Sequence, residues 1–378
     1  MDLARALEPV LDAARENASD VDTNSRFPHE AVAALRESGL CGLTVPSEAG
    51  GMGCGPEELV TAVARIAAAC GSTAMVYLMH VSATMTVAAA PPSGQPKLLE
   101  QLADGTALGT LAFSETGSRS HFWAPTSQAR ADGATVELAA PKSFVTSAGH
   151  ADVYIVSTLQ PAATSAESPG VDIYAIPGDR SGVTTAGSWQ GLGLRGNASA
   201  PMRFELETGD GDRLGAAGGG FALMLEAVLP WFNLGNAAVS LGFAKAAVDA
   251  AIRHASGARL EHLDESLAQL PTIRAQLSRM SLDLAATEAY LGAAARSIAA
   301  PDDATTLHVL GAKAYANDAA LRITDAAMRV CGGAAFSHHL QLERFFRDAR
   351  AGSVMAPTAD VLYDLYGRAL AGLALFEN

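Results

Sequence analysis

The side chains that could carry chemistry do not form a compact metal or hydrolase motif. The cysteines stand far apart, with no Cys-x-x-Cys pair and no histidine at zinc-finger spacing, which predicts small buried hydrophobes in a reducing compartment. His338 and His339 lack a third ligand at useful spacing, so no metal is expected. The SETGS stretch at 114–118 is followed by a polar loop, which excludes a Ser-His-Asp nucleophile elbow. The cysteines are Cys41, Cys54, Cys70 and Cys331.

The composition is that of a large globular protein. The chain has 378 residues, of which 49% are hydrophobic and 17% charged, and this predicts two or three structural units with a large core. Its 26 Lys and Arg against 40 Asp and Glu give a net charge of −14. Because nothing concentrates positive potential for a phosphate backbone, nucleic acid is not an expected partner.

Neither a membrane segment nor a signal peptide is expected. Residues 66–96 contain no Asp, Glu, Lys or Arg over a length that could span a bilayer, but Ser, Thr and His interrupt this stretch and Pro91-Pro92 end it. A buried helix of a soluble protein is therefore predicted there. The first 20 residues are acidic and amphipathic instead of basic and then apolar, so a cytoplasmic location is predicted.

Three blocks of secondary structure must position the functional side chains. Residues 1–108 carry apolar residues at helical spacing, residues 109–215 hold short β-prone runs between turn residues, and residues 216–378 return to long helices. The predicted fold class is α+β, with an N-terminal helical domain, a middle antiparallel β-barrel or sandwich domain, and a C-terminal antiparallel four-helix bundle. The long C-terminal helices are expected at 221–254 (with a break at Pro230), 267–299, 304–330 and 359–375.

This order of blocks resembles the acyl-CoA dehydrogenase superfamily, which includes flavin-dependent monooxygenases of the same fold. Six segments fall in the family's order and together cover nearly the whole chain, although each alone is a weak signal. They are GLTVPSEAGGMG at 42–53, FSETGSRS at 113–120, SFVTSAGHADVYIV at 143–156, GLGLRGNASAPMRF at 191–204, CGGAAF at 331–336 and FRDARAG at 346–352.

The resemblance implies a flavin site built from these segments. A flat isoalloxazine ring needs an aromatic wall, donors at its redox-active edge and backbone amides for its pyrophosphate. Phe144 stands where the family places an aromatic against the ring, and Thr146 where a hydroxyl meets the N5 edge. Gly332 and Gly333 match the loop that meets a neighbouring subunit's cofactor, so a homodimer or homotetramer is expected. The expected cofactor-binding residues are Phe113, Ser114, Ser120, Phe144, Thr146, Ser147, Arg259, Arg329, Gly332, Gly333 and Thr358.

The chain departs from the family where the catalytic base should stand. In the register of Arg347-Asp348, Ala356 occupies the position of the usual Glu, and a methyl group takes no proton. A second base position used by some members holds Phe232, followed by Asn233 where most members keep an Arg. Arg259 lacks its usual Phe-Gly pair, and Arg329 replaces a glutamine, so flavin is expected to be held less tightly. Substitute bases are Glu226, Asp360, His338 and His339, each of which also has a structural interpretation.

Three hypotheses follow from this pattern. The first is an FAD-dependent oxidoreductase that acts on an acyl thioester with a displaced base or none, passing electrons to a transfer partner. Ser120 matches the family serine that touches the pantetheine arm, although His121 replaces the usual Asp after it.

The second hypothesis is a monooxygenase that receives FADH2 or FMN in reduced form from a separate reductase and hydroxylates a small organic substrate. Such a site needs a hydrogen-bond donor near flavin C4a, and His80 is the candidate. The third hypothesis is a non-catalytic subunit of a mixed oligomer. The candidate catalytic residues are His80, Thr146 and Asn233.

Overall fold

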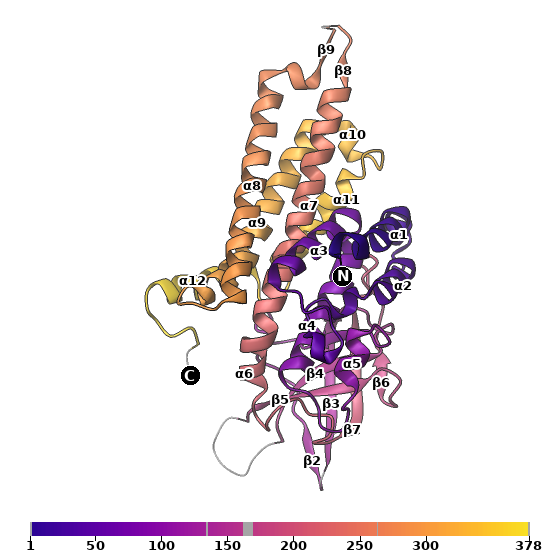
Figure 1. Ribbon diagram of the computed structural model, residues 1–378, viewed down its shortest axis with the longest axis vertical. Helices are drawn as coiled ribbons and strands as arrows, with labels where there is room; N and C mark the ends of the chain where they lie inside the picture. The colour runs from indigo at the N-terminus through magenta and orange to yellow at the C-terminus, as the bar shows by residue number, and fades with distance from the viewer. Residues whose placement is uncertain (1, 134, 162–168, 263, 377–378) are drawn as a thin grey trace.

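A computed structural model describes residues 2–133, 135–161, 169–262 and 264–376. Along the chain, helices precede and follow a β domain, which lies at the lower end of the molecule in Figure 1, with the long C-terminal helices extending above it. The α+β fold class predicted from the sequence is therefore confirmed.

The N-terminal part is helical throughout. Its helices are α1 (Leu3–Asn24), α2 (His29–Ser38), α3 (Pro56–Ala69), α4 (Gly71–Ala89) and α5 (Leu98–Ala103), with 3-10 turns at Leu40–Gly42 and Ser47–Ala49. The start of α3 is fixed by Pro56 in its first turn and by the Glu58 carboxylate, which accepts a 2.9 Å hydrogen bond from the Gly55 N–H. The uncharged stretch forms α4, in which every residue from 71 to 84 is buried.

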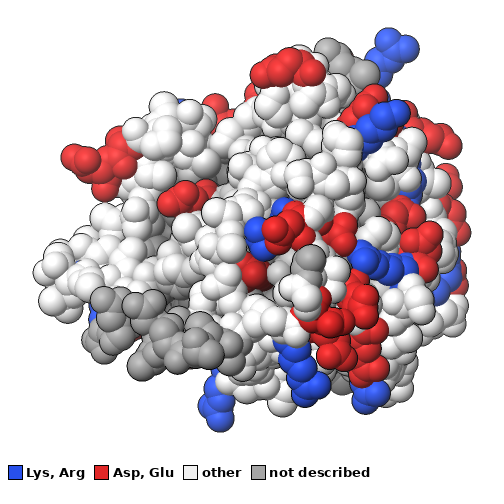
Figure 2. Space-filling view, turned by 90° about the horizontal axis from the view of Figure 1, so that it is seen from below, with Lys and Arg blue, Asp and Glu red and all other residues white. Residues whose placement is uncertain are grey.

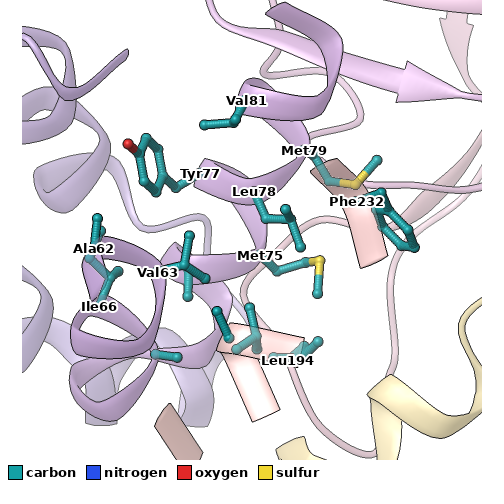
Figure 3. Close-up of a cluster of buried hydrophobic side chains, with 14 of the residues drawn as sticks. Ala62, Val63, Ile66, Met75, Tyr77, Leu78, Met79, Val81, Leu194 and Phe232 are labelled. Carbon is teal, nitrogen blue, oxygen red and sulfur yellow. The ribbon is translucent and has the colours of Figure 1, made fainter. Parts of the chain in front are cut away.

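The core around α4 links the N-terminal helices to the C-terminal ones. Figure 3 shows Val63 and Ile66 of α3 near one side of α4, while Met79 of α4 lies beside Phe232 on its other side. A helix that is apolar on every face must be covered on every face, and α4 packs on α3, β1 and α7. It is thus the element against which the functional site is built.

The middle domain is a sandwich of two sheets. One sheet has the order β1 (Gly109–Ala112), β4 (Val153–Leu159), β5 (Val171–Pro177), and the other β2 (Arg130–Asp132), β3 (Thr135–Val145), β7 (Ala200–Thr208), β6 (Val183–Thr185). Side chains such as Tyr154, Tyr174 and Phe204 fill the space between the sheets. One strand pair departs from the predicted antiparallel pattern, because β1 runs parallel to β4.

The C-terminal part begins with a helix that changes its winding. It runs through α6 (Gly220–Leu223), a π-helical segment at Met224–Val228 and α7 (Leu229–Gly257), with Pro230 in the first turn of α7. Because proline has no N–H to donate and its ring crowds the carbonyl four residues earlier, the winding widens just before it. The break predicted at Pro230 therefore appears as a local change of winding.

The remaining C-terminal elements stack along α7. They are the hairpin β8 (Arg259–Leu260) and β9 (Glu265–Ser266), a 3-10 turn at Leu267–Gln269, α8 (Pro271–Ala299), α9 (Thr305–Cys331), α10 (Gly333–Phe336), α11 (Leu342–Val354) and α12 (Ala359–Leu370). The long helices α7, α8 and α9 lie side by side, α11 packs on α7 and α9, and α12 packs on α9 (Figure 1).

The long apolar helix that runs from α6 through α7 is mostly buried. By length and composition the continuous helix Gly220–Gly257 could cross a membrane, but 67% of its apolar window is buried inside the protein, as in a core helix. The face in Figure 2 mixes acidic and basic side chains.

Candidate functional site

A cleft opens where the three parts of the chain meet. It holds about 400 Å³ of empty space, including its open mouth. Residues from α4, β1, the loop after β1, β3, the π-helical segment, α7 and the turn after α11 all contribute to its walls. The lining residues are Met79, Leu111, Phe113, Ser114, Phe122, Ser143, Phe144, Val228, Phe232 and Ala356.

Several residues singled out in the sequence converge in this cleft. Phe113, Ser114 and Phe144, predicted to contact a flavin, line the same walls as Phe232 and Ala356, which occupy the two expected base positions. These five residues come from segments up to 243 positions apart, as their numbers show.

Phe144 reaches the cleft because β3 carries a bulge. Lys142 pairs with Met202 and Val145 with Ala200, so β3 has one residue more than β7 between these two pairs. The backbone accommodates the extra residue of the bulge because Phe144 adopts a φ of +54°. This conformation costs a bulky residue about 1–3 kcal/mol. Its ring is 70% exposed and meets Trp189 edge to face, with centroids 6.3 Å apart. An exposed aromatic held in this way is suited to form the wall for a flat ligand.

A buried ion pair sets the distance between the two cleft-forming segments. The Lys142 ammonium contacts the Glu115 carboxylate and donates to the Ser157 carbonyl at 2.5 Å, and both charged side chains are almost completely buried. Glu115 also accepts hydrogen bonds from the N–H and hydroxyl groups of Thr126 and Ser127. Although burial alone would raise it, Lys142 and these donors hold the pKa of Glu115 below its usual value. Lys142 thereby joins β3 to the loop that carries Phe113 and Ser114.

Polar atoms without partners lie beside the bulge. The Ser147 hydroxyl and the Asn197 side-chain nitrogen are buried and have no hydrogen-bond partner, although the backbones of the two residues are joined by a 2.9 Å hydrogen bond from the Ser147 N–H. The Thr146 hydroxyl shares a 3.0 Å hydrogen bond with the Ser199 hydroxyl. Buried polar groups are normally paired, so unpaired ones next to an exposed aromatic fit a polar, flat ligand. The residues present therefore fit a flavin.

The base positions are chemically inert in the structure. Among the cleft-lining residues, all within the described ranges, none has a side chain that titrates in water below pH 12. Asn233 is fully buried, and its side-chain nitrogen donates to the Val309 carbonyl at 3.0 Å, so it faces α9 and does not line the cleft. The methyl group of Ala356 and the ring of Phe232 cannot accept a proton.

His80 is buried away from the cleft. Its Nδ1 accepts a 3.1 Å hydrogen bond from the Gly109 N–H, and its Nε2 lies 3.1 Å from the Cys41 carbonyl oxygen. The ring is therefore the neutral Nε2–H tautomer, with both nitrogens bound to backbone. Burial lowers its pKa to about 4. His80 therefore ties α4 to β1 and does not line the cleft, and its role as a proton donor there stays a prediction.

Ser120 and Thr358 meet although they are far apart in sequence. Their hydroxyl oxygens lie 3.1 Å apart. Thr358 directly precedes α12 and lies two residues after Ala356. The pair therefore joins the loop after β1 to the turn that contains Ala356.

The other predicted cofactor residues do not line the cleft of this chain. Arg259 bonds Asp264 within the β8–β9 hairpin, and Arg329 pairs with Asp325 at 2.9 Å along α9. Gly332 has a φ of +54°, which favours glycine, and space around Gly333 is open. Their expected contact with a neighbouring subunit's cofactor stays a prediction.

None of the four substitute bases lines the cleft either. Glu226 lies in the π-helical segment, while His338 is exposed and lies 3.0 Å from a Glu343 oxygen. His339 follows it in the same exposed loop, and Asp360 lines a second cleft beside Trp123.

Two site features escaped sequence reasoning. Lys142 occupies an inward-facing position of a strand whose exposure alternates, and such a lone inward lysine is the signal for a buried partner. Lys313, in the middle of α9, is also fully buried. Lys313 donates hydrogen bonds to backbone carbonyls of the turn that contains Ala356, so both lysines contact segments that form the cleft.

Comparison with known protein families covers nearly the whole chain. Residues 5–106, 110–206 and 218–371 match the profiles of the acyl-CoA dehydrogenase N-terminal, middle and C-terminal domains, respectively. A probable acyl-CoA dehydrogenase of Mycobacterium leprae is 27% identical over 356 residues, which is 94% of this chain and 90% of the relative.

Solved structures share the fold at lower identity. Butyryl-CoA dehydrogenase from Megasphaera elsdenii superposes with a TM-score of 0.90 at 22% identity, covering 98% of this chain and all of that one. The FAD complex of PigA gives 0.89 at 17% identity, covering 98% and 96%. FMN-bound TdsC from Paenibacillus gives 0.86 at 23% identity, covering 97% of each chain.

Breaking the buried ion pair should destabilise the protein and weaken flavin binding together. Lys142→Met leaves the Glu115 carboxylate buried without its counter-charge, which costs about 3–5 kcal/mol, whereas Lys245→Met removes an exposed lysine 3.9 Å from Asp249 and changes stability by about 0.5 kcal/mol or less. Urea unfolding and flavin titration measure both effects. Adding Glu115→Gln to Lys142→Met should recover part of the loss; equal stability of Lys142→Met and wild type would contradict the role of the pair.

The buried His80 should make stability depend on pH in the acidic range. Its folded-state pKa of about 4 lies below the ordinary value of 6.5, so between these values the unfolded chain binds the extra proton. Stability linked to His80 is complete above about pH 6.5 and falls by about 3 kcal/mol as the pH drops to about 4. Unfolding curves of wild type and His80→Gln from pH 4 to 7 measure this. Identical pH profiles for the two proteins would refute the assignment.

Proposed function

The chain belongs to the acyl-CoA dehydrogenase family, whose members are generally flavin-dependent oxidoreductases, and we propose that it oxidises its substrate without a protein carboxylate base. Its reaction is the oxygenation of a small, largely apolar organic molecule by a flavin, FAD or FMN, supplied in reduced form. This places the protein beside the monooxygenases of the fold rather than beside its dehydrogenases.

The bulge region of β3 is the proposed flavin site. Phe144 would form the aromatic wall, and the Thr146 and Ser147 hydroxyls would hydrogen-bond the flavin edge, since Ser147 has no partner of its own. A bound flavin supplies two-electron chemistry and, when reduced, the activation of oxygen. The protein's own part is to hold the ring, to place the substrate against it and to exclude water.

The single observation that carries the proposal is the composition of the cleft. Its described walls are aromatic, aliphatic and thioether side chains with two serine hydroxyls. Abstraction of a substrate proton without a positioned base loses about 10²- to 10⁴-fold in rate, so this cleft does not support dehydrogenation. Oxygen transfer needs no such base: substrate, O₂ and the two electrons and two protons of the reduced flavin give hydroxylated substrate, water and oxidised flavin.

The partners follow from this chemistry. A separate flavin reductase would supply the reduced cofactor, and the protein would work in the cytoplasm as a homodimer or homotetramer. In such an assembly Arg259, Arg329, Gly332 and Gly333, which lie outside this chain's cleft, would meet the flavin of a neighbouring subunit.

The proposal is tested by mixing the reduced flavin complex with oxygen in a stopped-flow instrument. We expect oxygen to be consumed before the oxidised flavin spectrum returns, because the apolar cleft keeps water away from the flavin. Phe144→Ala should shorten this lag, whereas Leu282→Ala, a change at an exposed position of α8, should not. Prompt reoxidation with one equivalent of hydrogen peroxide released would overturn the proposal, and failure to bind any flavin would leave only the non-catalytic subunit.

A second candidate function, oxidation of an acyl thioester, is favoured by the Ser120–Thr358 contact. Ser120 matches the family serine that touches the pantetheine arm, and the contact at 3.1 Å places it near the turn of Ala356. The Ala356 N–H has no acceptor within the described part of the chain, so it is available to a substrate carbonyl. This reading requires a base that the cleft does not contain.

Installing the missing carboxylate separates the two candidates. If an acyl thioester binds with its α-carbon beside residue 356, Ala356→Glu should raise the rate of anaerobic flavin reduction by butyryl-CoA at least about 10²-fold. Ala356→Gln has the same size without a base and serves as the control. A rate equal for both variants would show that the thioester does not bind there.

A further inference from the structure

Asp348 of α11 is a buried carboxylate without an ion-pair partner. The residue is 2% exposed, and its Oδ1 accepts a 2.7 Å hydrogen bond from the Leu194 N–H. The adjacent Arg347 pairs with Asp22 and Glu343 instead, and no ion pair within the described part of the chain includes Asp348. Because a buried carboxylate without a counter-charge is costly, the groups that it contacts indicate its use.

The second carboxylate oxygen of Asp348 faces the beginning of α4. A Cβ added at Gly71 would lie 2.8 Å from Asp348 Oδ2, so the carboxylate packs directly on the first turn of this helix. Burial raises the pKa of Asp348 to about 6, although the hydrogen bond from the Leu194 N–H acts in the opposite direction. The positive end of the α4 dipole also favours the ionised carboxylate. Asp348 therefore changes charge a little below neutral pH.

The Leu194 N–H belongs to the loop 186–199, which connects β6 to β7. Leu194 and Ala198 both have a φ of +51°, a left-handed conformation that residues with a Cβ rarely adopt. Gly193 has no room for a side chain, because a Cβ would lie 2.7 Å from the backbone of α11. The path of the loop is therefore set by its contact with α11, and Asp348 supplies the charged acceptor in that contact.

The first part of this loop reaches the proposed aromatic wall of the flavin site. The indole N–H of Trp189 donates a 2.9 Å hydrogen bond to the Leu194 carbonyl. The Trp189 ring meets the Phe144 ring edge to face, with centroids 6.3 Å apart. A single side chain thus connects the residue that Asp348 holds to the exposed aromatic ring.

The last part of the loop reaches the proposed polar edge of the flavin site. The Ser199 hydroxyl lies 3.0 Å from the Thr146 hydroxyl, and the Asn197 carbonyl accepts a 2.9 Å hydrogen bond from the Ser147 N–H. The loop 186–199 therefore contacts all three residues of β3 and the turn after it that are proposed to bind flavin.

The other charged and titratable groups around Asp348 are held by partners of their own or stay neutral. Burial raises the pKa of the Cys70 thiol above its usual value, and arginine keeps its charge in proteins. Arg344 donates to the Ala69 carbonyl at 3.3 Å. The groups are Arg344 and Arg347 of α11, Asp22 of α1, Cys70 before α4 and Arg195 of the loop, which donates to the Ser25 hydroxyl.

We propose that Asp348 is a positioning residue that holds the loop 186–199 against Phe144, Thr146 and Ser147, and that flavin binds more tightly when this carboxylate is ionised. A proton on Asp348 weakens the hold, because a hydrogen bond to an ionised acceptor is about twice as strong as one to a neutral acceptor. This inference rests on the proposed function in one respect, that the bulge region of β3 binds flavin.

Titration of the full-length protein with oxidised FAD, from about pH 5 to about pH 7.5, tests the proposal. The affinity should be complete above the pKa of about 6, and the dissociation constant should rise about fivefold as the pH falls through it. Asp348→Asn keeps an acceptor for the Leu194 N–H but cannot ionise, so it should bind weakly at every pH. Asp249→Asn, at an exposed position of α7, should reproduce the wild-type profile.

Two results would overturn the proposal. One is a wild-type dissociation constant that does not change over this pH range, and the other is a wild-type pH profile in Asp348→Asn. Absence of FAD binding at every pH would overturn the proposed function as well, whereas binding that is independent of pH would overturn this inference alone.

A measurement on the flavin-free wild-type protein covers the case in which Asp348→Asn does not fold. In protein labelled with ¹⁵N-leucine, nuclear magnetic resonance should show the Leu194 amide signal moving with pH, with a midpoint near pH 6. If the variant folds, its Leu194 signal should not move. A Leu194 signal that stays fixed in the wild type over this pH range would overturn the proposal.

Discussion

The buried contact between Lys142 and Glu115 is the constraint on which the geometry of the cleft depends. It joins the strand before Phe144 to the loop after Phe113, and both segments line the cleft. Hydroxyl and amide donors around Glu115 leave the carboxylate little freedom to move. A charge pair in this setting contributes less to net stability than to a single fixed arrangement, because desolvation offsets much of the attraction. The Ser143 N–H also donates to the Ser114 carbonyl at 2.8 Å, so the ion pair reinforces a backbone contact beside the bulge of β3.

A second buried lysine fixes the remaining wall in a different way. Lys142 is paired with a carboxylate, whereas Lys313 is solvated by three backbone carbonyls. The first lysine joins two segments whose side chains line the cleft, and the second holds backbone carbonyls of the turn that contains Ala356. Buried lysines hold the segments that form the cleft, and mostly apolar side chains line it. Such a cleft is rigid but contains no base. At Ala356 the cleft wall presents a methyl group, which cannot abstract a proton, next to the aromatic side chains of the proposed flavin site.

The sequence predicted the fold well and the site in part. The order of helices and strands was readable because hydrophobic spacing changes from helical to alternating and back. Convergence of Phe113, Phe144, Phe232 and Ala356 was predictable only through resemblance, since they lie far apart in sequence. The parallel pairing of β1 with β4 was not, because a short strand does not reveal its partner's direction. The placement of His80 could not be predicted either, because a histidine in an apolar helix has the same sequence context whether it faces a cavity or a backbone carbonyl.

The central claim is that the cleft binds its substrate beside a flavin but contains no group that removes a proton from it. Proton exchange at the α-carbon of butyryl-CoA tests this most directly, because exchange requires a base and no net oxidation. In D₂O, nuclear magnetic resonance should show no exchange above the buffer rate when the flavin-loaded protein is present. Protein-dependent loss of the α-proton signal, saturating with butyryl-CoA, would contradict the account.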